Sequence, residues 1–123
     1  MNAFTSEAYK QLAQGGANLI LSPFNIATAL SMALAGARGK TAKQIQDVLD
    51  VCYDATYDRA LRSQLAGLAK AGNAHGNELL TANGLWVQNG LAIHTAFEKT
   101  LADNYQAPPM LVDFIANPEA PRS

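Results

Sequence analysis

Apolar side chains recur at helical spacing along the first half of the chain. Phe4, Ala8 and Leu12 lie four residues apart and predict an amphipathic helix over residues 2–14, which the glycine pair after it would end. The same spacing predicts a further helix over residues 55–71, with a leucine-rich face opposite a basic one.

The segment between these two helices predicts a strand and then a buried helix. Leu19-Ile20-Leu21 is a short apolar run bounded by turn residues, which is typical of a buried strand. Ser22 suits the N-cap of a helix and Pro23 its first position. Because no charged side chain follows before Arg38, we expect this helix to be buried all round. Its small polar residues form one stripe: Asn25, Thr28 and Ser31. We expect each to find a partner in a neighbouring element, since an unpaired buried polar group costs about 1–3 kcal/mol.

The next helix is predicted to begin at a capping box, Thr41-x-x-Gln44. One face of it carries Ile45, Val48, Leu49 and Cys52. The segment before it, Gly36-Ala-Arg-Gly39-Lys40-Thr41, looks like a phosphate-binding loop, but such a loop needs a preceding strand and a glycine where this chain has Leu34. We interpret it as a turn between two helices.

The second half of the chain mixes strands with helices. Residues 79–88 predict a strand with apolar side chains on both faces, followed by a turn at Asn89-Gly90. A helix capped by Thr95-x-x-Glu98 comes next and carries Phe97, Leu101 and Tyr105. The last predicted elements are a strand over residues 110–114 and a helix start at Asn117-Pro118-Glu119. Helices first and a mixture afterwards predict an α+β fold.

Composition narrows the class of protein without naming a function. The 123 residues are 49% hydrophobic, which fits one domain with a sizeable core. A net charge of −1 does not favour a nucleic-acid partner, and the single cysteine excludes a disulfide scaffold. No stretch suits a membrane span, and the first residues lack the basic-then-apolar layout of a secretory signal. We therefore expect neither a nucleic-acid nor a membrane partner.

Few residue types suggest catalysis. Cys52 could act as a nucleophile with His75 or His94 as its base, but a lone cysteine on an amphipathic face is usually just packed. The histidines have no cysteine or carboxylate at ligand spacing, so no metal site is predicted. Four aspartates are explained as solvated or helix-terminal charges: Asp47, Asp50, Asp54 and Asp58. We expect neither an enzyme nor a bound cofactor.

A basic stripe is the candidate binding surface. Arg59, Arg62 and Lys70 cluster opposite the leucine-rich face of the helix predicted over residues 55–71. The stripe could hold a polyanion such as a sulfated polysaccharide. Three charges opposite an apolar face are, however, more often only the solvent side of a helix.

Several motifs occur together in a fixed order. Residues 18–27 are Asn-Leu-Ile-Leu-Ser-Pro-Phe-Asn-Ile-Ala, and a small-residue helix leads from them to Gly36-Ala-Arg-Gly-Lys-Thr41. The later motifs are Ile45-x-x-Val-Leu49, Thr81-Ala-Asn-Gly-Leu-Trp-Val87, Phe97 within a capped helix, Tyr105 and Val112-Asp-Phe114. In this combination, essentially all 123 residues resemble the N-terminal part of the serpins, the serine-protease-inhibitor superfamily.

The resemblance implies a truncated serpin-like fold. Residues 1–123 would be the N-terminal part of a single domain, containing its N-terminal helices and the first strands of its large sheet. Serpins trap a target serine (or cysteine) protease through a reactive loop near the C-terminus, which is cleaved and then inserts into the sheet as an extra strand. That loop is absent from this chain, so we expect the chain alone to fold poorly and to inhibit no protease.

The resemblance also assigns one group of residues a conformational role. Ser22, Pro23 and Asn25 match the shutter region that lets the serpin sheet open. Where this chain has Asn25, the family often has serine, which is smaller and carries one donor instead of two.

Two other functions are compatible with the sequence. A non-inhibitory serpin-like binding or carrier protein would differ only in the missing loop and its hinge. A self-contained helical interaction module would melt cooperatively as this chain alone. The resemblance favours the extracellular space, whereas the lack of a leader favours the cytoplasm, so the compartment is not predicted.

Overall fold

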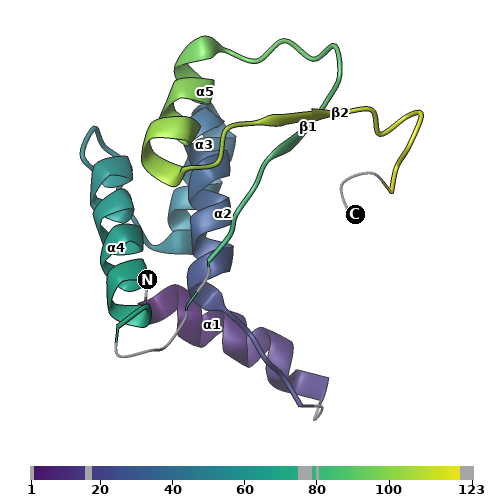
Figure 1. The fold of residues 1–123 in the computed structure, drawn as a ribbon. Coiled ribbons are helices and arrows are strands. Elements are labelled where there is room, and N and C mark those ends of the chain that lie inside the picture. The colour runs from purple at the N-terminus through teal and green to yellow at the C-terminus, as the bar shows by residue number, and fades with distance from the viewer. Residues whose placement is uncertain (1, 16–17, 75–78, 80, 120–123) are drawn as a thin grey trace.

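The computed structural model describes residues 2–15, 18–74, 79 and 81–119, and its ribbon is drawn in Figure 1. In chain order the elements are α1 (Asn2–Leu12), a 3₁₀ turn η1 (Ala13–Gly15), α2 (Pro23–Gly36), α3 (Gly39–Leu49), α4 (Tyr57–Gly72), β1 (Trp86–Gln88), α5 (Thr95–Thr100), a π-helical turn η2 (Leu101–Tyr105) and β2 (Met110–Val112). The helices gather around α2, and the two strands lead away from them (Figure 1). The predicted α+β class is confirmed.

Helix α2 begins as the sequence predicts but is not buried all round. Ser22 is its N-cap and Pro23 its first residue, as expected. Its buried residues are Ala27, Thr28, Ser31, Met32, Leu34 and Ala35. Ala29 and Ala33 are exposed, and Ile26 is 37% exposed. The polar stripe therefore lies on the buried side, and part of the apolar surface faces outward, the reverse of what hydrophobicity alone favours.

The boundaries of α3 differ from the prediction at both ends. The helix begins at Gly39, whose φ of +58° suits glycine, and its N-cap Arg38 makes no capping side-chain bond, so the Thr41 capping box is wrong. The helix ends at Leu49, because Asp50 adopts the left-handed conformation with φ of 53°. Cys52 therefore lies beyond the helix and is exposed, not packed as its spacing predicted.

The strands are shorter than predicted, and one is missing. Residues 18–22 form no strand, and Ile20 is fully exposed. The segments predicted over residues 79–88 and 110–114 shrink to the three-residue strands β1 and β2, which pair in parallel. A strand forms only where a neighbour accepts and donates its backbone hydrogen bonds, and the described residues offer each strand one neighbour at most.

Strand β1 is not covered on both faces, although coverage of both faces was predicted for residues 79–88. Trp86 is opposite Met110 in the pairing, and both side chains are more than 40% exposed, at 41% and 43%. Further backbone bonds extend the pairing at each end, from the Met110 amide to the Leu85 carbonyl and from the Asn89 amide to the Val112 carbonyl, both 2.8 Å long. The two-stranded sheet is thus complete in its internal bonds and open at its outer edges.

The connection between the strands confirms most of its sequence signals. Asn89 and Gly90 form a turn, with φ of +87° at Gly90. Helix α5 begins at Thr95, but its N-cap is His94 and no side chain caps it. The helical path continues as η2, whose residues Leu101 and Tyr105 are buried as predicted.

The helix start predicted at residues 117–119 is a turn. The Glu119 amide donates to Asn117 Oδ1 over 3.3 Å, and residues 118–119 have turn geometry. Any continuation beyond residue 119 lies outside the described residues.

Two apolar clusters hold the helices together, and α2 contributes to both. One cluster has the buried residues Met32, Leu61, Leu101, Tyr105 and Ala107 and joins α2, α4 and η2. The other has Phe4, Ala27, Leu34 and Leu49 and joins α1, α2 and α3. The helix with the fewest charges is therefore the one that every other helix contacts.

Candidate functional site

The start of α2 carries the residues that the sequence singled out as a shutter. The Asn25 amide donates to Ser22 Oγ over 3.4 Å, which is a helix cap, and Pro23 fills the position where no amide is needed. The side chain of Asn25 is half-buried, and only the backbone amide of this residue is hydrogen-bonded to another described side chain. Its carboxamide is therefore free to bond a group outside the described chain.

The polar residues farther along the stripe are already paired. Thr28 donates its hydroxyl hydrogen to the Phe24 carbonyl over 2.8 Å, so its partner is its own helix and not a neighbour as predicted. Ser31 Oγ lies 2.8 Å from the Ala27 carbonyl and 2.9 Å from the Tyr57 hydroxyl on α4. Both side chains are 1% exposed, so they stabilise the interior and are not presented to an incoming strand.

A second polar centre, which the sequence analysis missed, surrounds Asp58 on α4. Tyr53 Oη donates to Asp58 Oδ2 and Tyr105 Oη donates to Asp58 Oδ1, each over 2.6 Å. We call Tyr53, Asp58 and Tyr105 the Asp58 clamp. Burial, and then the bond to the Asp58 carboxylate, raise the pKa of both tyrosine hydroxyls well above 10. Both hydroxyls therefore stay protonated and act as donors at neutral pH.

Asp58 is a helix-terminal charge as predicted, because it lies in the first turn of α4, but it is not fully solvated. Asp54 also behaves as a helix-terminal charge: its carboxylate accepts bonds from the Thr56 and Tyr57 amides at 2.7 and 3.1 Å, and bonds from Thr56 lower its pKa. Asp58 is instead half-buried between two tyrosines from different segments. The tyrosines at core positions could have indicated this polar centre from the sequence, because a buried phenol needs a hydrogen-bond partner for its hydroxyl.

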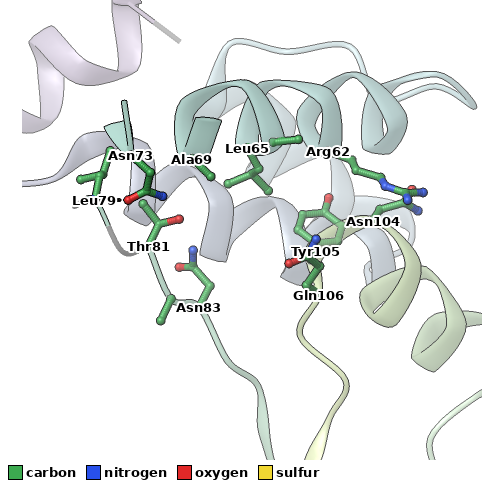
Figure 2. A pocket seen from close by; sticks show the side chains of 12 residues that line it. Arg62, Leu65, Ala69, Asn73, Leu79, Thr81, Asn83, Asn104, Tyr105 and Gln106 are labelled. Atoms are coloured by element: carbon green, nitrogen blue, oxygen red, sulfur yellow. Dashed lines mark hydrogen bonds between the residues drawn. The ribbon is translucent and has the colours of Figure 1, made fainter. Parts of the chain in front are cut away.

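A cleft of about 340 Å³ lies beside the clamp, between α4, residues 79 and 81–83, and η2. Its floor is apolar, with Leu65 and Ala69 of α4, while the Tyr105 ring forms part of one wall (Figure 2). The polar side chains that line it are Arg62, Asn73, Thr81, Asn83, Asn104 and Gln106. The described lining thus combines an apolar floor with four neutral amides, one threonine hydroxyl and one guanidinium, a surface that can form hydrogen bonds.

The basic stripe does not close into one compact site. Arg59, Arg62 and Lys70 are all exposed on α4, and none forms an ion pair with another described residue. Arg62 lies at the cleft, with Asn104 at the same end (Figure 2). The polyanion surface therefore stays a prediction.

The remaining catalytic candidates among the described residues lie in different segments of the chain. Helix α2 precedes the Gly36–Thr41 segment, where a phosphate-binding loop would need a strand. His94 caps α5 and Cys52 lies in the α3–α4 linker, while His75 falls outside the described residues. Among the described residues, no group of histidine, cysteine and acidic side chains could hold a metal ion, and no helix has the length and apolar character of a membrane span.

The described residues thus define an α+β protein in which packed helices adjoin a two-stranded parallel sheet. A family model, Serpin (serine protease inhibitor), matches residues 1–123. The chain therefore belongs to the serpin family.

Individual relatives agree with the family model. An uncharacterised serpin-like protein of Thermococcus kodakarensis is 37% identical over 118 residues, which are 96% of this chain and 28% of that protein. Intracellular coagulation inhibitor 2 of Tachypleus tridentatus is 31% identical over 95% of this chain and 29% of its own length. The chain thus spans less than a third of these curated relatives.

Solved structures show the same fold. Serpin48 of the insect Tenebrio molitor superposes with a TM-score of 0.82 at 32% identity, over 98% of this chain and 33% of that chain. The native stressed conformation of Arabidopsis AtSerpin1 gives a TM-score of 0.83 at 26% identity, over 95% of this chain and 31% of that one. The expected truncated serpin fold is therefore confirmed.

Proposed function

We propose that the complete protein inhibits serine-type endopeptidases as a suicide substrate, and that residues 1–123 are the N-terminal part of its single domain. The observation that carries the proposal is the open edge of the two-stranded sheet among the described residues. Strands β1 and β2 bond only to each other among the described residues, and Leu111 is 59% exposed. An open sheet edge accepts further strands, and strand addition is the physical basis of loop insertion.

The chemical step would take place on a reactive loop outside this chain. The protease serine attacks a loop carbonyl, the peptide bond breaks, and an acyl-enzyme ester forms. The freed loop then adds to the sheet, and its new backbone bonds and buried side chains drive the movement. Trapping succeeds when insertion is faster than hydrolysis of the ester, so inhibition depends on relative rates.

Within this mechanism we assign the shutter role to Ser22, Pro23 and Asn25. The cap at Ser22 and the fixed φ of Pro23 hold the start of α2 rigid. The Asn25 carboxamide, which has no partner among the described residues, would bond the strand that closes over it. Asparagine supplies two donors and one acceptor carbonyl there, where serine would supply one hydroxyl.

We retain Arg59, Arg62 and Lys70 as a candidate polyanion surface. Exposure of all three supports access by a large ligand. Their spread over more than two turns of α4 argues for weak, salt-sensitive binding, since separated surface charges are strongly screened.

Incubation of the complete protein with trypsin-, chymotrypsin- and elastase-like proteases tests the main proposal. We expect a covalent complex that survives SDS with at least one of them, and no complex with residues 1–123 alone. Cleavage without complex formation by every protease would favour the non-inhibitory binding or carrier protein. A cooperative melt of residues 1–123 alone would instead favour the self-contained module.

A further inference from the structure

The described chain divides into two packed parts. The helical layer, residues 18–74, contains α2, α3 and α4, and the βαβ unit, residues 81–118, contains β1, α5, η2 and β2. Figure 1 shows α5 next to the helices and the strands leading away from them. Between these two parts there is one hydrogen bond, from Tyr105 Oη to Asp58 Oδ1, and it is 2.6 Å long.

Apolar packing also joins the two parts. Met32 and Leu61 of the helical layer pack with Leu101 and Ala107 of the βαβ unit. Apolar packing is non-directional, so such a contact tolerates small shifts along the interface. A short bond to a carboxylate depends strongly on distance and angle. The Tyr105–Asp58 bond is therefore the directional contact that sets the position of the βαβ unit on the helices.

Asp58 is held firmly from its own side of the interface. Tyr53 bonds its second oxygen, and the Tyr53 amide donates to Gln46 Oε1 over 3.0 Å, which ties the α3–α4 linker to α3. Tyr105 approaches from the other part on η2, whose π-helical turn is a kind of element that often marks a functional position. Because Tyr105 is only 6% exposed, a broken bond would leave its hydroxyl in the interior.

We propose that the Tyr105–Asp58 hydrogen bond is a latch that fixes the βαβ unit against the helical layer and must break before the sheet can open. Asp58 is then a positioning residue. The latch itself follows from the contacts between the two parts, whereas its effect on protease trapping rests on the proposed function.

Two matched variants of the complete protein test the latch. Tyr105→Phe removes the bond that crosses the interface, while Tyr53→Phe removes an equally short bond to the same carboxylate within the helical layer. We expect backbone amide hydrogen exchange in residues 101–112 to accelerate about fivefold to tenfold in Tyr105→Phe. Tyr53→Phe should leave that region unchanged. If Tyr105→Phe does not fold, Asp58→Asn is the second variant and should also accelerate exchange there.

Equal exchange rates in Tyr105→Phe and Tyr53→Phe, or acceleration confined to α3 and α4, would overturn the latch. Protease trapping supplies an independent measurement. If the wild-type protein forms the covalent complex, we expect Tyr105→Phe to raise the insertion rate by up to about tenfold. Faster exchange in a protein that traps no protease would uphold the latch and refute the proposed function.

Discussion

Leu101 is the side chain whose loss should destabilise the protein most. It is fully buried where α2, α4 and η2 meet, with Met32 and Leu61 among its cluster neighbours. Replacing it with alanine removes three buried carbon atoms and leaves a cavity, and such changes cost about 2–5 kcal/mol. We expect the upper half of that range, because the Asp58 clamp holds the adjacent turn in place and prevents the site from collapsing.

Urea denaturation of the complete protein measures this effect through the transition midpoint. Leu91→Ala is the matched control, because the same atoms are removed from a side chain that is 64% exposed, and it should cost less than about 0.5 kcal/mol. Leu101→Met keeps the volume and should cost less than about 1.5 kcal/mol. A loss below about 1 kcal/mol for Leu101→Ala would refute the reasoning that this interface is tightly packed.

Three further predictions concern the clamp and the α2–α5 contact. Asp58→Asn removes the charge from two short bonds and should lower stability by about 1–2 kcal/mol after allowance for solvent screening; an unchanged urea midpoint would contradict this. The two clamp tyrosines have raised pKa values in the folded protein. The stabilisation that they provide should therefore be complete below about pH 10 and should decline as the pH rises above it. The absorbance change on ionisation of Tyr53 and Tyr105 should appear near pH 10 only after unfolding. A Cβ at Gly36 would lie 2.9 Å from Phe97 Cε2, so Gly36→Val should cost about 1–3 kcal/mol in a melting experiment, and a stabilised variant would show that the ring moves freely.

Local signals in the sequence predicted much of the framework. The Ser22-Pro23 start of α2 and the helix predicted over residues 55–71 each depend on residues within a few positions of one another, and both are confirmed, although Leu68 of the apolar face is 38% exposed. The order of motifs was also sufficient to indicate the serpin family, which the family model confirms. Such features need no knowledge of distant segments, because capping and periodicity are properties of one element.

Contacts between distant segments were decided only by the tertiary structure. Tyr53, Asp58 and Tyr105 meet across two chain segments, and no spacing rule relates residue 58 to residue 105. Cys52 is exposed because the chain leaves the helix at Asp50, although its spacing continues the apolar face. The run Leu19–Leu21 has strand character but pairs with no strand of the described residues, so it stays irregular. Sequence by itself determined where each element can begin and which faces are apolar, while the fold decided which faces are covered and which strands form, because burial and pairing require a partner from elsewhere in the chain.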